Sequence, residues 1–229
     1  MKKIISFCLW GKDPMFTDGA VRNAKVAPDV YPDWTCRFYI DDTVPLETVG
    51  ELKRLGAEIR VGESFEGYMK EFWRAFPSFD DPDVERFISR DCDALLSERE
   101  AVAVKEWEES GKTIHNMRDH KNHTHPITGG MWGGVPSQMA GFQRILSRFI
   151  DTPFGDTICM KPEKLYFGVD TTFYSNIMYP LYEEDMLTHD DRKTIRGDEL
   201  PFVIPLPNNY SFIGNKYEGC GRPVYTDES

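Results

Sequence analysis

The chain has 229 residues, of which 40% are hydrophobic and 28% charged, a composition that excludes an intrinsically disordered protein. Its formal net charge of -11 argues against nucleic acid as a partner, because an acidic protein repels a phosphate backbone. No apolar run approaches the length of a membrane span, and five scattered cysteines without a C-x-x-C pair indicate reduced thiols in a soluble, cytoplasmic protein.

Strand-like and helix-like stretches alternate along the first half of the chain. Short apolar runs predict strands at 4–9, 36–40, 58–61 and 86–90, and helical spacing of apolar residues predicts helices at 18–27, 45–55 and 68–76. This alternation predicts an α/β fold with a doubly wound, mostly parallel central sheet flanked by helices. Ligands of such sheets bind beyond the carboxyl ends of the strands.

In the second half of the chain the regular alternation of strand-like and helix-like stretches ends. Ser97 and Glu100 predict the capped start of a helix that ends at Gly111. The stretch 115–136 is rich in His, Gly and Thr and predicts a loop, 138–150 predicts a helix, and the tail from 191 predicts loops and short strands. Because no linker is evident, we expect one domain over 1–229, with a nucleotide-binding part at about 1–96 and a sugar and acceptor part at about 97–229.

Two of the predicted strands lead directly into acidic pairs. Asp41 and Asp42 follow the second strand, and Asp91 and Asp93 follow the fourth. Carboxylates one residue apart on an extended segment face the same side, so Asp91 and Asp93 could grip Mn²⁺ or Mg²⁺ and neutralise a diphosphate through it. The alternative is an acidic loop at the end of a strand, without a ligand.

Several motifs together resemble one enzyme family. They read Arg90-Asp91-Cys92-Asp93, Ser97-Glu98-Arg99-Glu100, Arg118-Asp119-His120 and Gly129-Gly130-Met131-Trp132-Gly133. With them, residues 1 to about 190 resemble the nucleotide-sugar-dependent glycosyltransferases of the GT-A fold, and most closely a group of small members. The resemblance implies a GT-A-like sheet and a metal-dependent transfer of a hexosyl or related sugar from a nucleoside-diphosphate sugar to a hydroxyl of a glycan or another acceptor.

The resemblance also implies contacts with the donor nucleotide. The segment from Ser6 through Leu9, Trp10 and Gly11 would face the base and ribose. Asp41 or Asp42 would do the same. Arg74 would meet the diphosphate, to which its planar fork can make two parallel hydrogen bonds, whereas Arg90 would contact the donor or brace the carboxylates. An ordinary surface ion pair is the alternative for Arg74.

The segment from Gly129 to Gly134 lacks the spacing of a phosphate-binding loop. Glycines such as Gly130 would allow the backbone to approach a ligand closely. Trp132 would stack on a sugar face, or would be a core tryptophan next to a tight turn.

Two late residues complete the site that the resemblance implies. Asp170 lies where related enzymes carry an acidic residue beside the transferring sugar, although Thr171 replaces the amide residue that often follows it. Asp170 would bind a sugar hydroxyl or act as general base. His189 would be a third metal ligand, as in several retaining members of the fold, and therefore favours a retaining reaction.

Four of the five histidines lie between His115 and His125. The spacing of His120 and His123 is compatible with a zinc site, although no cysteine stands near them. A loop along the active site, with Asp119 and His120 against donor or acceptor, is the favoured interpretation.

Two other classes of function stay open. A nucleotidyltransferase can use a similar sheet and metal, but it usually has a glycine-rich phosphate loop after the first strand, where only Gly11 occurs. A module that binds a nucleotide or sugar without turnover is the second class. Donor hydrolysis with Mn²⁺ would separate a transferase from such a module.

Overall fold

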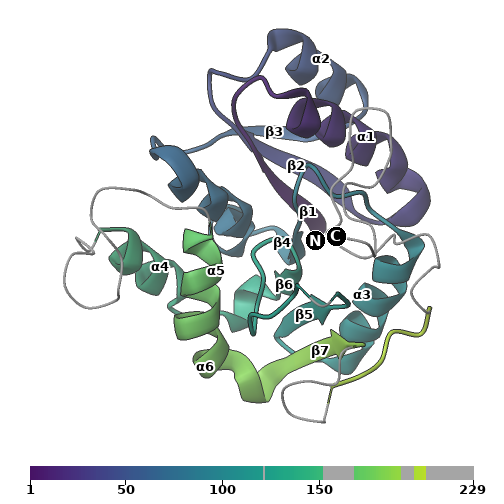
Figure 1. Cartoon of the computed structure of the whole chain (residues 1–229), viewed down its shortest axis with the longest axis vertical. Coiled ribbons are helices and arrows are strands. Elements are labelled where there is room, and N and C mark those ends of the chain that lie inside the picture. Colours follow the sequence, from purple (N-terminus) through teal and green to yellow (C-terminus); the bar gives the residue numbers. More distant parts are fainter. Residues whose placement is uncertain (121, 152–167, 192–198, 205–229) are drawn as a thin grey trace.

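A computed structural model describes residues 1–120, 122–151, 168–191 and 199–204. In these ranges seven strands form one sheet in the order β3-β2-β1-β4-β6-β5-β7 (Figure 1). The strands are β1 (Lys2–Leu9), β2 (Thr35–Ile40), β3 (Glu58–Val61), β4 (Val84–Ser89), β5 (Ile114–Arg118), β6 (Trp132–Gly134) and β7 (Met186–Asp190).

The sheet is mostly parallel, as the sequence predicts. β1 pairs in parallel with β2 on one side and with β4 on the other, β3 pairs in parallel with β2, and β7 does so with β5. Only β6, among the described strands, runs antiparallel to its neighbours β4 and β5. The chain order reverses at β1, which lies between β2 and β4, so the carboxyl ends of β1 and β4 border a switch point of the sheet.

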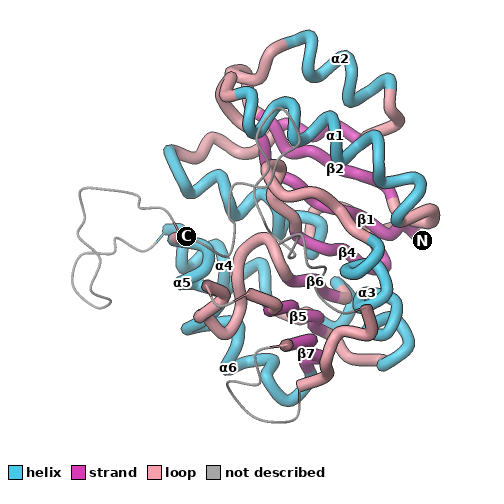
Figure 2. Tube along the Cα trace, turned by 45° about the vertical axis from the view of Figure 1, so that its right-hand side comes forward, coloured by secondary structure: helices cyan, strands magenta, loops and turns pink. Residues whose placement is uncertain are grey.

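Helices cover both faces of this sheet, and Figure 2 shows the strands between them. On one face, α1 (Pro14–Val30), α2 (Leu46–Arg54) and α3 (Glu98–Ser110) contribute to a core cluster with β1 and β2. α1 begins earlier than expected from apolar spacing, because the side chain of Asp13 accepts a hydrogen bond from the Met15 amide and Pro14 occupies the first turn.

The other face is covered by η1 (Gly67–Ser78), α4 (Phe142–Asp151) and α5 (Val169–Phe173). Their aromatic residues, among them Phe72, Phe149 and Phe173, pack edge to face in a second core cluster. The chain then passes through η3 (Tyr174–Met178), α6 (Tyr179–Tyr182) and η4 (Glu183–Asp185) into β7, and the short η2 (Pro136–Gln138) precedes α4.

Two local expectations need correction, whereas the helix expected at 68–76 is present as the 3₁₀ helix η1. α4 begins at Phe142 and not at 138. The stretch 115–136, expected to be a loop, supplies most of β5 and all of β6. Gly133 allows β6 to lie against β4, since a Cβ there would be 2.7 Å from the Phe87 carbonyl oxygen.

The predicted limits of α3 are confirmed: Ser97 caps its start and Gly111, with φ of 73°, ends it in the left-handed region. Of the tail, only residues 191 and 199–204 are described, and Leu200 pairs with His189; the other loops and strands expected there lie outside the described residues. None of the helices in the described ranges combines the length and apolar character that crossing a bilayer requires.

Candidate functional site

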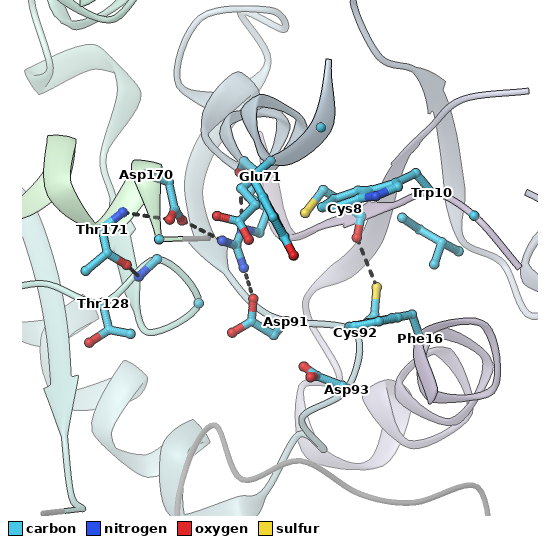
Figure 3. A pocket seen from close by; sticks show the side chains of 18 of the residues that line it. Cys8, Trp10, Phe16, Glu71, Asp91, Cys92, Asp93, Thr128, Asp170 and Thr171 are labelled. Atoms are coloured by element: carbon cyan, nitrogen blue, oxygen red, sulfur yellow. Dashed lines mark hydrogen bonds and ion pairs between the residues drawn. The ribbon is translucent and has the colours of Figure 1, made fainter. Parts of the chain in front are cut away.

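A cavity of about 830 Å³ opens beyond the carboxyl ends of β1 and β4 (Figure 3). Its walls come from the end of β1 with the loop into α1, from η1, from the loop after β4, from residues 122–130 and from the start of α5. Eight of the site residues expected from the sequence line this cavity: Leu9, Trp10, Gly11, Arg74, Asp91, Asp93, Gly130 and Asp170.

The acidic loop after β4 brings Asp91 and Asp93 to the same cavity. The loop continues the sheet for one residue, because the Arg90 amide donates to the Ser6 carbonyl, and it then turns with the Ala94 amide 3.3 Å from the Asp91 carbonyl oxygen. The side chain of Asp91 is 38% exposed, whereas Asp93 is 5% exposed. One carboxylate is therefore open to an incoming ligand and the other is held inside the wall.

Arg74 is buried on η1 and joins two carboxylates. One guanidinium nitrogen contacts Asp91, the other lies 2.6 Å from Oδ2 of Asp170, and Nε donates to the Glu71 carbonyl oxygen at 3.2 Å. Burial by itself lowers the pKa of Arg74, but the surrounding negative groups, including Asp170 and Glu71, raise it above its ordinary value. Arg74 is thus a charged, buried bridge and not the surface ion pair that the sequence left as its alternative.

Asp170 lies in the first turn of α5 and is 1% exposed. Its Oδ2 contacts Arg74, and its Oδ1 accepts a hydrogen bond from the Thr171 amide at 2.6 Å. Two glycines leave room for these carboxylates. A Cβ at Gly129 would be 1.9 Å from Oδ2 of Asp170, and a Cβ at Gly130 would be 2.1 Å from Oδ2 of Asp91. The glycine segment therefore lets the backbone approach two protein carboxylates closely, whereas the expected approach to a ligand stays a prediction.

The cavity has a polar end and an apolar end. Figure 3 shows Thr128, Asp170 and Thr171 on one side of Asp91, and Trp10 and Phe16 on the other. Trp10 is braced by the edge of Trp73, with ring centroids 6.4 Å apart. Burial raises the pKa of the nearby Cys8 thiol to about 12, so this thiol is neutral at ordinary pH.

The lining is negatively charged. Its described residues include five carboxylates, of Asp13, Glu71, Asp91, Asp93 and Asp170, against two cations, Lys12 and Arg74. A phosphorylated ligand would meet net repulsion here unless it arrived with a cation. The charge balance is therefore favourable for a divalent metal and unfavourable for a bare diphosphate.

Several expected nucleotide contacts lie elsewhere. Ser6 is fully buried in β1, and Asp41 forms an ion pair with Lys70 at 2.6 Å. Asp42 is exposed, and none of these three lines the cavity. Arg90 is buried against Glu100 of α3, with Nε 3.3 Å from the carboxylate, and it braces that helix instead of Asp91 or Asp93.

Trp132 is a core residue, which was the alternative interpretation. It is fully buried on β6, and its ring lies 5.1 Å from that of Phe87 and 5.0 Å from that of Tyr174. Stacking on a sugar is therefore excluded in this conformation, because no face of the indole reaches the cavity.

The histidine-rich loop reaches the cavity with residues other than those expected. Asp119 is buried in an ion pair with Arg99, and the His120 ring lies 5.8 Å from that of His123. The cavity is lined instead by Asn122 and His125. In the described ranges no three His, Cys, Asp or Glu side chains are grouped so that they could hold a metal ion through protein ligands alone, so the zinc alternative gains no support.

His189 does not reach the two carboxylates' cavity. It is fully buried on β7, with Nε2 2.7 Å from Glu106 of α3 and Nδ1 2.9 Å from Nε2 of His115 on β5. Both ring nitrogens have protein partners, and the residue does not line the cavity. The expected role of His189 as third metal ligand is therefore wrong.

Sequence reasoning also missed residues of the lining. Glu71 lies one turn before Arg74 on η1, and in a 3₁₀ helix residues three apart eclipse each other. The three-residue spacing between Glu71 and Arg74 would have identified Glu71 as a lining residue if a 3₁₀ helix had been expected there. Phe16, Tyr68, Asn122 and His125 lie in turns or at helix starts, where no periodicity marks them.

No protein-family model matches the chain, and no curated protein is similar to its sequence. Solved structures are similar in fold at low identity, among them the following three. The glycosyltransferase involved in glycosylation of the major capsid of PBCV-1 has a TM-score of 0.53 and 12% identity over 83% of this chain and 82% of its own. The glycosyltransferase GlyE of Streptococcus pneumoniae TIGR4 has a TM-score of 0.50 and 13% identity over 82% of this chain. The match covers 46% of GlyE.

The third is the 4-diphosphocytidyl-2C-methyl-D-erythritol synthase of Anaerococcus prevotii DSM 20548, with a TM-score of 0.50 and 9% identity over 82% of this chain and 87% of its own. These likenesses establish the fold: a GT-A-like α/β sheet, as expected from the sequence.

Proposed function

We propose that this chain is a metal-dependent glycosyltransferase that moves a sugar from a nucleoside-diphosphate sugar to an acceptor hydroxyl. One observation carries the proposal. Asp91 and Asp93, at the carboxyl end of β4, line a single cavity together with the buried cation Arg74 and the buried carboxylate Asp170. A transferase of this kind needs oxygen ligands for a metal, a positive group for a leaving diphosphate and a polar contact for the sugar in one place.

The residues present fit a hard divalent cation. Asp91 and Asp93 offer carboxylate oxygens, which Mn²⁺ and Mg²⁺ prefer, and the missing side chain of Gly130 leaves the space that the Asp91 carboxylate occupies. Bound there, the cation would offset the charge that develops on a departing diphosphate. Asp93 is held in place by the wall, whereas Asp91 must loosen its contact with Arg74 to become a ligand.

The shape of the cavity suggests how the donor lies. Trp10 and Phe16 give the apolar end a surface on which a nucleobase would stack. Thr128, Thr171 and Asp170 at the other end supply hydrogen-bonding groups for sugar hydroxyls. The diphosphate would then lie between them, beside the acidic loop and Arg74.

Arg74 and Asp170 have complementary parts in this scheme. Arg74 would keep its contact with Asp170 and turn the arm that now contacts Asp91 toward the diphosphate, where a guanidinium makes charge-assisted hydrogen bonds. Asp170 would bind a sugar hydroxyl or take the proton of the acceptor, and the second task requires one of its present donors to give way. Because His189 lies away from the cavity, it no longer favours a retaining reaction. The anomeric configuration of the product distinguishes a retaining from an inverting transfer.

Donor hydrolysis tests the proposal. A panel of UDP- and GDP-sugars is incubated with the protein and Mn²⁺, and the nucleoside diphosphate that is released is quantified. We expect release from at least one donor, its loss on chelation of the metal, and faster release with a carbohydrate acceptor. Nucleotide binding without any turnover across the panel would favour the non-catalytic module instead.

A nucleotidyltransferase is the second candidate, because the synthase from Anaerococcus prevotii shares the fold at the same TM-score as GlyE. Such an enzyme would transfer the nucleoside monophosphate part of a nucleoside triphosphate to the phosphate of its substrate and release pyrophosphate. Assay of pyrophosphate against nucleoside diphosphate as the product separates the two transferases directly.

A further inference from the structure

We propose that Asn23 of α1 is a positioning residue that fixes the placement of Asp91 and Asp93. The proposal rests on the function proposed above, which assigns the metal to these carboxylates. Asn23 lies outside the main cavity, on the far side of the acidic loop, and its side chain is fully buried. A residue so placed can act on a ligand only through the loop that it holds.

The side-chain amide of Asn23 forms three hydrogen bonds to the backbone of that loop. Its Nδ2 donates to the carbonyl oxygens of Cys92, at 3.2 Å, and Ala94, at 2.7 Å. Its Oδ1 accepts from the Leu96 amide at 3.0 Å. One side chain thus binds three peptide groups within five residues, and the first of them lies between the two carboxylate residues.

The chemistry of the amide makes this set of contacts demanding. Two carbonyl oxygens require an N–H₂ donor, and one peptide N–H requires an oxygen acceptor, so only one orientation of the Asn23 amide satisfies all three. An aspartate would lose both donors and face two carbonyl oxygens. An apolar side chain would leave all three peptide groups without this partner in a buried place.

A second set of contacts fixes the same peptide from both sides. Gly19 lies one helical turn before Asn23, and a Cβ there would be 2.1 Å from the Cys92 carbonyl oxygen. On the β1 side, the Cys92 thiol donates to the Cys8 carbonyl oxygen at 3.3 Å. Cys92 is therefore anchored to α1 and to β1, and Asp91 and Asp93 project from an anchored centre.

This arrangement resembles the outer-shell partners that orient metal ligands in other proteins, whose loss typically lowers metal affinity by about 10–100-fold. We expect a comparable loss here. The test measures affinity for UDP and GDP by calorimetry, with Mn²⁺ and with chelator, in the wild type, Asn23→Ala and Asn23→Ser. Asn23→Ser is the milder change and carries the test if Asn23→Ala does not fold.

The matched control is Ala24→Gly, which weakens α1 at the neighbouring buried residue but keeps the Asn23 amide and its three hydrogen bonds. We expect the metal-dependent gain in nucleotide affinity to fall about tenfold or more in the Asn23 variants. The gain should persist in the control when its thermal stability is as low as that of the Asn23 variants. Equal gains in all folded variants would overturn the positioning role and leave the proposed function standing. No metal-dependent gain in the wild type would overturn both.

Discussion

The guanidinium of Arg74 lies 2.6 Å from the carboxylate of Asp170, although 96 residues separate them in the chain. Their side chains are 4% and 2% exposed, so the pair is withdrawn from water. The pair joins η1 to the start of α5. The next three predictions, on stability, Mn²⁺ affinity and nucleotide affinity, depend on this contact.

Breaking this pair from one side should be costly. Arg74→Met would leave Asp170 charged and buried without its partner, and we expect the free energy of unfolding to fall by about 3–5 kcal/mol. Adding Asp170→Asn should recover much of that loss, because the unpaired charge is gone. Urea unfolding of the two single variants and the double variant gives the coupling energy, and additive effects would contradict a direct interaction.

Arg74 should also compete with a metal for Asp91. In the double variant Arg74→Met/Asp170→Asn the net charge of the site is unchanged, but Asp91 has lost its guanidinium partner. We expect Mn²⁺ alone to bind this variant about tenfold more tightly than the wild type, a difference of about 1.4 kcal/mol. Manganese titrations without nucleotide measure this, and equal or weaker binding would show that the contact does not oppose the metal.

The same arginine should favour the nucleotide once the metal is present. We expect the double variant to lose about 1.5–3 kcal/mol of affinity for a nucleoside diphosphate with saturating Mn²⁺, the usual scale for a hydrogen bond to a charged group. The Asp170→Asn single variant is the control, because it keeps the arginine. If both variants bind the nucleotide equally, Arg74 has only a structural part.

Gly130 should be intolerant of any side chain. Gly130→Ala places a Cβ 2.1 Å from Oδ2 of Asp91, so the carboxylate must move and metal-dependent binding should fall. Gly50→Ala in α2 is the control, since a Cβ there meets nothing within 4 Å and should stabilise the helix by up to about 1 kcal/mol. Calorimetry and thermal unfolding of the two variants check both expectations, and unaltered binding by Gly130→Ala would argue against Asp91 as a ligand.

The buried histidine pair should make stability depend on pH. Burial lowers the pKa of His115 well below its ordinary value, with a smaller contribution from His189, and burial also lowers the pKa of His189 despite the opposing effect of Glu106. Below about pH 6.5 the unfolded chain therefore binds more protons than the folded one, and stability falls as the pH drops.

Thermal unfolding between pH 7.5 and 5 tests this, with His115→Phe as the variant that keeps an aromatic ring stacked on Trp107. We expect a shallower loss of stability on acidification in this variant than in the wild type. His189→Gln should leave Mn²⁺ affinity unchanged, since His189 does not line the cavity, and a loss of metal binding there would restore it as a ligand.

Much of the fold was predictable because it depends on local patterns. Apolar runs marked β1 to β4, and Ser97 with Gly111 marked the limits of α3. β5 and β6 were missed for physical reasons. β5 carries buried polar residues such as His115 and Asn116, and two of the three residues of β6 are glycines, which strand propensity disfavours.

The site was predictable where residues follow a strand and unpredictable where they are gathered by distant contacts. Asp91, Asp93 and Gly11 reach the cavity because the strands before them end there. The partners of Arg74 depend on how η1 meets α5, which the sequence does not display. His189 was assigned as a metal ligand from the order of motifs. That order does not show that its side chain on β7 contacts Glu106 of α3 instead of facing the cavity.

Calorimetric titration of UDP and GDP with Mn²⁺ shows whether Asp91 and Asp93 hold a metal. We expect the wild type to bind the nucleotide with Mn²⁺ and to lose this binding on chelation. We expect loss of that binding in both Asp91→Asn and Asp93→Asn, because each change removes a carboxylate charge at nearly constant side-chain volume. Undiminished metal-dependent affinity in both variants would contradict a metal site at Asp91 and Asp93.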